Sequence, residues 1–239
     1  MMGGGHLACS GLRAAVRGRT VFDGSALDLG RGVHALRGEN GIGKSTLLRL
    51  LAGAQPLEAG RAVIDGIDLT QAPEAARRRL GYVPDESPVY PFMTGEDLLR
   101  FVAAARRVTV GAGLRAMLDG FGLERHLRTR FDAMSLGTRR KMLLCAAWIG
   151  SPPVLLLDEP SNGLDPEARD YLADLLRRAG EEKMVLFSSH DVEFMAACGA
   201  TSIEMRSLFP PLFRPGGMSA DSGGGGGVSS KLHIATSAP

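Results

Sequence analysis

The chain has few cysteines, and none is placed for a disulfide framework or a zinc site. Its 239 residues contain three, namely Cys9, Cys145 and Cys198, which lie far apart with no CxxC pair. Small secreted domains held by disulfides use several cysteines at regular spacings, and zinc sites use closely paired ones. The cysteine pattern therefore excludes both classes and fits a reducing cytosol.

Long apolar runs and a large net charge are also missing. The longest apolar stretch, Met142–Ile149, is far shorter than the ~18 residues that a membrane span needs. The N-terminal residues lack a basic start followed by an apolar core, so no signal peptide is expected. The net charge of +2 is too small to indicate a nucleic-acid partner. Hydrophobic residues at 44% and charged residues at 23% predict one packed domain with room for a subdomain.

Apolar segments of alternating type indicate an α/β fold with a parallel sheet. Continuous aliphatic runs are typical of strands buried on both faces, and helical apolar spacing indicates helices. The order strand, helix, strand implies right-handed crossovers in a parallel sheet. The expected strands are Val33–Leu36, Val154–Leu157 and Met184–Phe187, and the expected helices are Ser45–Ala52 and Ala168–Ala179.

Residues 86–150 interrupt this alternation, because they contain helical stretches and no strong strand. The stretches are Gly95–Ala105, Gly111–Phe121 and Arg139–Ile149. We therefore expect a helical subdomain at 86–150, inserted into a P-loop core made of residues 1–85 and 151–205.

The composition changes again at residue 206. Half of residues 206–239 are Gly, Ser or Pro, and five glycines follow one another. Such a segment buries little apolar surface and predicts a flexible tail or linker. A docking peptide around Leu208–Phe213 is the alternative.

The strongest motif is a P-loop between an expected strand and an expected helix. Residues 38–46 read GENGIGKST and match GxxxxGK[ST]. Glycines let successive backbone N–H groups face a phosphate, and the following helix points its N-terminus at the same anion. Lys44 would contact the β- and γ-phosphates, and the Ser45 hydroxyl would bind Mg²⁺. The predicted nucleotide-binding residues are Gly38, Glu39, Asn40, Gly41, Ile42, Gly43, Lys44, Ser45 and Thr46.

Two carboxylates, Asp158 and Glu159, follow the expected strand Val154–Leu157. They would lie at the C-terminal edge of a parallel sheet, where α/β proteins bind ligands. Asp158 is then the expected Mg²⁺-binding acid, and Glu159 is placed to polarise a water. An aliphatic strand followed by acidic residues is common and alone does not indicate a function. Together with the P-loop, however, Asp158 and Glu159 predict a single nucleotide site.

Three further segments each have an ordinary structural interpretation. Ser135, in Met134–Thr138, could be a helix N-cap. Asp165, before Pro166, could start the next helix. A histidine at a strand end, such as His190, is more often a loop residue than a catalytic one. The shared order and spacing of these segments favour a common function instead.

In the order of these motifs the chain resembles the nucleotide-binding subunits of ABC transporters, over about residues 12–205. The resemblance implies a P-loop core with a helical subdomain. It also implies that the protein binds Mg²⁺ and hydrolyses ATP. It implies that two subunits close head to tail over two ATP molecules, with Ser135 and Gly137 binding the partner's γ-phosphate. Asp165 would lie on the loop that couples the two sites.

The resemblance also assigns catalytic roles. Glu159 would be the general base toward the attacking water, and His190 would sense the γ-phosphate. Lys44 completes the set of residues expected to be catalytic.

The sequence departs from the family at several positions. The signature reads MSLGT at 134–138 where LSGGQ is usual, and Asp85 stands where Gln is common. Asp85 would add negative charge near Mg²⁺ as a further ligand. Val16 occupies the position of the usual adenine-stacking aromatic, with Phe22 as the alternative. The variant motifs resemble those of exporter ATPases for drugs, antibiotics or polysaccharides.

The resemblance implies partners as well. An ATPase without its own span would work at the cytoplasmic face of the membrane with an integral membrane permease and a second ATPase subunit, identical or different. Tyr90 and Phe92 would either receive the permease or belong to the subdomain core. A soluble ABC-type ATPase without a transport role, or a regulatory member with weakened hydrolysis, are the alternatives.

Overall fold

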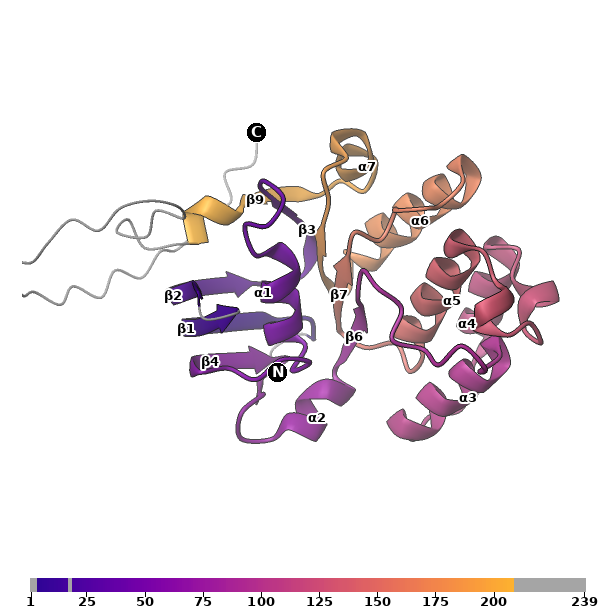
Figure 1. Cartoon of the computed structure of the whole chain (residues 1–239), viewed down its shortest axis with the longest axis horizontal. Coiled ribbons are helices and arrows are strands. Elements are labelled where there is room, and N and C mark those ends of the chain that lie inside the picture. The colour runs from indigo at the N-terminus through magenta and orange to yellow at the C-terminus, as the bar shows by residue number, and fades with distance from the viewer. Residues whose placement is uncertain (1–3, 17–18, 209–239) are drawn as a thin grey trace, which may run out of the picture.

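The computed structural model describes residues 4–16 and 19–208, which form two sheets with helices between and beside them (Figure 1). One sheet has five strands in the order β6-β7-β8-β3-β9, and all its pairings are parallel. The predicted α/β fold with a parallel sheet is confirmed. The strands are β3 (Gly32–Arg37), β6 (Leu80–Val83), β7 (Val154–Asp158), β8 (Met184–Ser188) and β9 (Thr201–Glu204).

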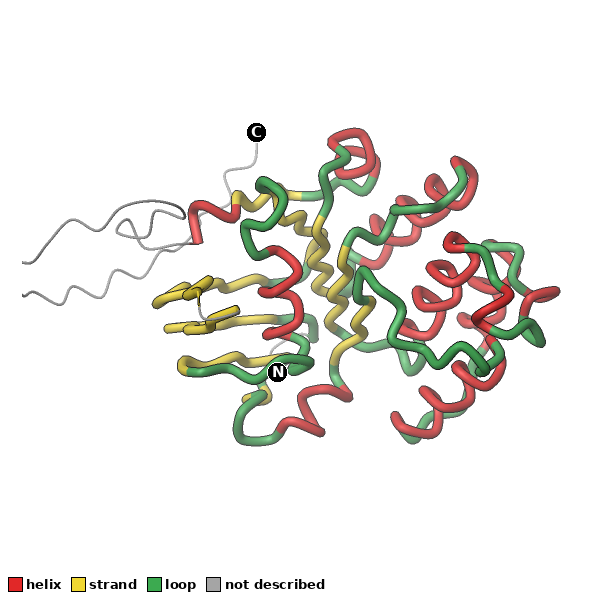
Figure 2. The backbone as a smooth tube through the Cα atoms, in the orientation of Figure 1, coloured by secondary structure: helices red, strands yellow, loops and turns green. Residues whose placement is uncertain are grey.

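The predicted strands β7 and β8 lie inside this sheet, and every residue in both is buried. Side chains of a strand alternate between its two faces. In β7, Leu155 and Leu157 join a core shared with the helical region, whereas Val154 and Leu156 join a core shared with the second sheet. Figure 2 shows the parallel sheet standing between these two parts of the molecule.

Helices cover both faces of the parallel sheet. Helix α1 (Lys44–Leu51) lies between the two sheets, where its leucines are fully buried. Helices α5 (Leu136–Trp148) and α6 (Pro166–Ala179) cover the opposite face. Helix α5 approaches β6 so closely that a Cβ on Gly81 would lie 2.3 Å from the Ala147 carbonyl oxygen, and glycine is therefore required there.

The second sheet is antiparallel, with the order β2-β1-β4-β5, and none of its strands was predicted from the sequence. One face of it is buried against α1, through residues such as Leu7, Leu12 and Phe22. Its apolar alternation is hard to see because the register shifts between Cys9 and Leu12. The strands are β1 (Leu7–Val16), β2 (Arg19–Leu29), β4 (Ala59–Ile64) and β5 (Ile67–Asp68).

The three helices expected within residues 86–150 are present. They are α3 (Gly95–Arg106), α4 (Ala112–Gly120) and α5, and the short 3₁₀ helices Glu124–His126 and Phe131–Ala133 lie between the last two. Helix α5 begins three residues before the predicted start, and α6 begins at Pro166, two residues before its predicted start. Two further short helices are α2 (Pro73–Arg78) and α7 (Val192–Ala197).

The expected tail begins with residues that are part of the fold. Residues Met205–Leu208 form a 3₁₀ helix, and Met205 and Leu208 are buried beside the antiparallel sheet. The prediction of a flexible segment from 206 is therefore wrong for Arg206–Leu208, because their apolar neighbours anchor them. Residues 209–239 lie outside the described part of the chain. Within the described part, no helix combines the length and apolar character needed to cross a membrane.

Candidate nucleotide site

The P-loop connects β3 to α1 and curls around the side chain of Lys44. Gly43, the residue before the helix, has φ 111°, a conformation that favours glycine. The Lys44 ammonium donates to the carbonyls of Gly38 and Glu39 at 2.7 and 3.2 Å. Burial lowers the pKa of Lys44, while the charges of Glu159 and Asp158 oppose that shift. The loop thus holds a cation beside backbone N–H groups, an arrangement suited to phosphate.

The Asp158 carboxylate lies against the first turn of α1. Its Oδ1 accepts hydrogen bonds from the hydroxyls of Ser45 at 3.1 Å and Ser188 at 2.7 Å. Asp158 is only 2% exposed. Among the described residues no cluster of three or more His, Cys, Asp or Glu could hold a metal. However, Mg²⁺ at a nucleotide needs only one or two protein oxygens besides phosphate and water, and Ser45 and Asp158 fit that set.

Glu159 has an uncommon backbone conformation and a defined partner. Its φ of 45° lies in the left-handed region, and its N–H donates to the Ser188 hydroxyl at 2.8 Å. One carboxylate oxygen lies 3.1 Å from His190 Nε2. Burial raises the pKa of Glu159, although His190 and Lys44 oppose the shift. A carboxylate with a raised pKa is a better proton acceptor.

Lys44, Ser45, Glu159 and His190 line one pocket of about 500 Å³ at the C-terminal edge of the parallel sheet. Asp158 and Ser188 do not line it. The structure therefore brings the P-loop, Glu159 and His190 together, as predicted, and Asp85 lines the same pocket. Arg49 and Asn162 also line it, and neither was predicted from the sequence. Arg49 lies one helical turn beyond the P-loop, a spacing that could have indicated it. The lining residues are Asn40, Gly41, Gly43, Lys44, Ser45, Thr46, Arg49, Asp85, Glu159, Asn162 and His190.

Asp85 is paired with an arginine that the sequence analysis did not consider. Its Oδ1 accepts from Arg140 Nη2 at 2.9 Å, and its carbonyl accepts from the same nitrogen at 2.7 Å. Arg140 belongs to α5 and is nearly fully buried. The two residues are far apart in sequence, and the pairing is set by the packing of α5 on β6.

Ser135, Gly137 and Asp165 do not line this pocket. Ser135 is the N-cap of α5, where its Oγ accepts from Thr138 N at 3.2 Å. Asp165 caps α6 and accepts from Lys141 Nζ at 2.6 Å. Gly137 lies against the carbonyl of Gly163, in the turn before α6. Both caps have the ordinary structural role considered above, and the three residues lie outside the chain's own site.

Of the two residues considered for adenine stacking, the structure describes the side chain of Phe22 alone. Phe22 is fully buried beneath the antiparallel sheet, so the expectation that its ring meets adenine is wrong. The side chain of Val16 lies outside the described part of the structure.

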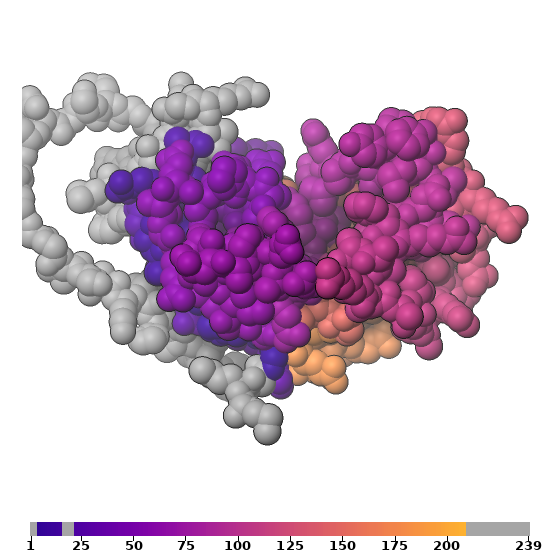
Figure 3. All heavy atoms as spheres, turned by 90° about the horizontal axis from the view of Figure 1, so that it is seen from below, coloured from indigo at the N-terminus to yellow at the C-terminus, as the bar shows by residue number. Residues whose placement is uncertain are grey.

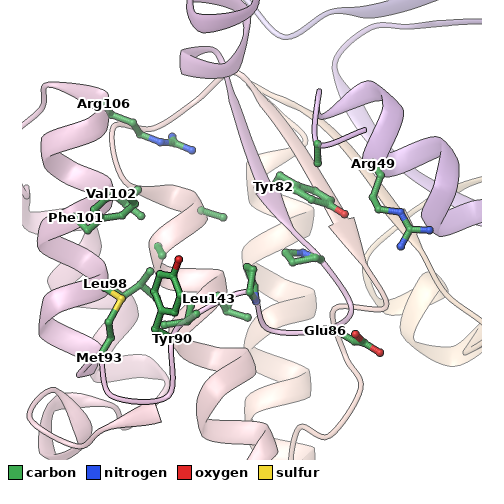
Figure 4. Close-up of a pocket in the computed structure, with 16 residues that line it drawn as sticks. Arg49, Tyr82, Glu86, Tyr90, Met93, Leu98, Phe101, Val102, Arg106 and Leu143 are labelled. Atoms are coloured by element: carbon green, nitrogen blue, oxygen red, sulfur yellow. The ribbon is translucent and has the colours of Figure 1, made fainter. Parts of the chain in front are cut away.

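A second, apolar groove of about 540 Å³ shares Arg49 with the nucleotide pocket. In the view of Figure 3 the surface is hollowed between residues of the antiparallel sheet and α2 and those of the helical region. Figure 4 shows Tyr90, Leu98 and Phe101 on one wall, with Tyr82 and Arg49 opposite. Tyr90 and Phe92 stack with their ring centroids 5.5 Å apart, and they are 66% and 65% exposed. They are therefore not subdomain core.

Comparisons with known proteins agree with this architecture. The family described as "ABC transporter" matches residues 23–162. Human phospholipid-transporting ATPase ABCA3 is 34% identical over 202 residues, which cover 82% of this chain and 12% of that protein. The linearmycin resistance ATP-binding protein LnrL of Bacillus subtilis is 29% identical over 79% of this chain and 63% of that protein. The chain thus spans less than two thirds of these relatives.

A solved structure described as the ATP-binding subunit of an ABC transporter covers 79% of this chain and 81% of its own, at 29% identity and a TM-score of 0.72. A bacterial Atm1-family ABC exporter with ATP bound covers 82% of this chain and 36% of its own, at 23% identity and a TM-score of 0.68. The second similarity concerns the fold alone.

Proposed function

Because this chain belongs to the ABC transporter family, we propose that it binds and hydrolyses ATP to drive a separate membrane permease. The observation that carries the proposal is the convergence of Lys44, the Ser45–Asp158 contact and the Glu159–His190 pair on one pocket. Phosphoryl transfer depends mainly on positioning and charge stabilisation. A pocket of backbone N–H groups, one lysine and two carboxylates meets that need.

The P-loop residues 38–46 hold the phosphates in this proposal. Their N–H groups and the Lys44 ammonium face the anion, and α1 adds its N-terminal dipole. Ser45 and Asp158, which already contact one another, hold Mg²⁺, and Asp85 lies nearby. When bound, the metal offsets the charge of the β- and γ-phosphate oxygens.

Glu159 takes the proton in the chemical step. The oxygen of a water attacks the γ-phosphorus, its proton passes to a Glu159 carboxylate oxygen, and the bond to the β-phosphate oxygen breaks to leave ADP and phosphate. Two features support this role: the pKa of Glu159 is raised by burial, and its backbone N–H is fixed by Ser188. His190, whose Nε2 lies 3.1 Å from a Glu159 carboxylate oxygen, orients that carboxylate and senses the γ-phosphate.

A second ATPase subunit completes the site. We assign Ser135 and Gly137 to the partner's γ-phosphate, because they lie at the N-terminus of the 13-residue helix α5 and outside the chain's own pocket. Asp165 lies beside them through its contact with Lys141 on α5.

In this proposal the permease docks in the apolar groove lined by Tyr90 and Phe101, and the chain works at the cytoplasmic face of a membrane. The groove lies between the loop after β6, which carries Asp85, and helix α3. A docked element would therefore touch a loop that also borders the nucleotide pocket. The relatives' names, which concern phospholipid transport and linearmycin resistance, support an exporter.

Lys44→Ala tests the function. The substitution removes a charge-assisted contact to phosphate worth about 1.5–3 kcal/mol, so the Kd for ATP should rise roughly ten- to a hundredfold. Lys183→Ala is the matched control, because Lys183 also donates to backbone carbonyls and has a pKa lowered by burial, but lies at the other end of β8. Unchanged ATP binding and turnover in Lys44→Ala would contradict the proposal.

A further inference from the structure

Arg140 is a charged side chain buried in the fold, and none of the roles above uses it. It lies in α5, five residues after the cap Ser135, and is 3% exposed. Burying an unpaired charge is costly, so a buried arginine is expected to have several hydrogen-bond partners. Its partners indicate what it does.

All of these partners lie at the edge of the sheet that carries the nucleotide pocket. Arg140 Nη1 donates to the carbonyls of Pro84 at 2.7 Å and Asp158 at 3.3 Å. Nη2 donates to the carbonyl and to the Oδ1 of Asp85, at 2.7 and 2.9 Å. One guanidinium therefore joins the ends of β6 and β7 to α5 and places the Asp85 carboxylate.

The charges around the pocket explain why this contact matters. Asp85 and Glu159 line the pocket, so two carboxylates face a site proposed to bind a triphosphate. A third, the buried Asp158, accepts a hydrogen bond from the lining residue Ser45. Two cationic side chains, Lys44 and Arg49, also line the pocket. Lys44 donates to P-loop carbonyls, Arg49 lies 3.4 Å from the Thr46 hydroxyl, and His190 lies 3.1 Å from Glu159. The Asp85 side chain is about half exposed, and it forms an ion pair with Arg140.

We propose that Arg140 is a positioning residue that acts through Asp85. It neutralises the Asp85 carboxylate and holds it at the rim, so that a triphosphate can enter a pocket already rich in carboxylates. The inference rests on the proposed function, since it concerns the same nucleotide. The affinity for ATP then depends on whether the negative charge of Asp85 is compensated by the positive charge of Arg140, and not on the presence of Asp85 alone.

Binding of fluorescently labelled ATP in EDTA, without Mg²⁺, tests this proposal on the full chain. Arg140→Gln leaves Asp85 uncompensated, and the Kd should rise roughly three- to tenfold, as expected for one extra charge in a partly screened site. Adding Asp85→Asn to Arg140→Gln removes that charge and should restore the wild-type Kd. A purely structural role for Arg140 predicts no such rescue.

Lys141→Gln is the matched control, because it makes the same charge change at the next position. Lys141 pairs with Asp165 and does not line the nucleotide pocket, so its Kd should stay at the wild-type value. An unchanged Kd in folded Arg140→Gln, or a defect that Asp85→Asn fails to rescue, would overturn the inference.

Arg140→Lys decides the matter if Arg140→Gln does not fold. It keeps the positive charge but loses the planar fork, so the Kd should stay within about twofold of wild type if charge is what matters. A rise in Kd as large as that predicted for Arg140→Gln would overturn the inference. A wild-type chain that binds no ATP, or a Lys44→Ala variant that binds as wild type does, would instead contradict the proposed function.

Discussion

At the scale of single residues, the Ser188 hydroxyl forms hydrogen bonds with both acidic residues of the site, Asp158 and Glu159. Ser188 donates to Asp158 Oδ1 and accepts from the N–H of Glu159. It is fully buried, and Glu159 is in the left-handed backbone region. Such conformations persist only when surrounding contacts hold them. Ser188 therefore holds the backbone of the proposed base, and it does not line the nucleotide pocket.

Ser188→Ala should lower both stability and ATP turnover. The Glu159 N–H loses its partner, which costs about 1–3 kcal/mol for a buried group, and turnover should fall by roughly tenfold because a small displacement of a base is costly. Denaturant unfolding and ATPase assays measure the two effects. Ser189→Ala is the control, since Ser189 is also buried but accepts from the N–H of Asp191. Equal turnover in the two variants would contradict the role of Ser188.

At the scale of elements, the apolar groove is a surface that the described residues leave uncovered. Tyr90 and Phe92 stack on one another in the loop before α3, with most of each ring exposed. Large exposed aromatic side chains that gather at a hollow indicate a protein interface. The position of the groove beside the Asp85 loop makes it the proposed permease site.

Substituting alanine at both Tyr90 and Phe92 should abolish co-purification with the membrane protein that the wild-type chain retains. Basal ATP turnover should stay within twofold, because neither ring lines the nucleotide pocket, and loss of the stack should lower stability by only about 0.5–1.5 kcal/mol. Val192→Ala, which truncates an exposed side chain on α7, is the control and should still co-purify with the membrane protein. Retention of the partner by the double variant would contradict the docking site.

The elements that were predictable from sequence are those with a strong local signal. Strands β7 and β8 are continuous apolar runs because both of their faces are covered. Strands β1 and β2 were missed because glycines and register shifts, as between Cys9 and Leu12, interrupt their alternation. Phe22 looked available for adenine, yet in the fold it belongs to the core of that undetected sheet.

At the scale of the whole molecule, the nucleotide pocket lies where two separately packed cores meet. Side chains of β7 supply both cores, and the strand ends in Asp158. Motif spacing predicted the P-loop and the acids at this edge, but could not predict Arg140, which is 55 residues from Asp85 in sequence. Such contacts depend on how α5 packs on β6, which no local pattern encodes.

The proposed dimer follows from the same layout. Ser135 and Gly137 lie at the start of α5, away from the pocket of their own chain. Each chain would therefore carry one part of two sites, and ATP would hold two subunits together until it is hydrolysed. A variant that binds ATP but cannot hydrolyse it should accumulate in this closed form.

The rate of ATP hydrolysis by Glu159→Gln tests the central claim most directly. Glutamine keeps the shape of the side chain but cannot take a proton, so hydrolysis should fall by roughly 10²–10⁴-fold. ATP binding should persist, because Lys44, Ser45 and Asp158 are unchanged, and size-exclusion chromatography in Mg-ATP should show a dimer. Hydrolysis at the wild-type rate would contradict the account, since Glu159 would then not be the base.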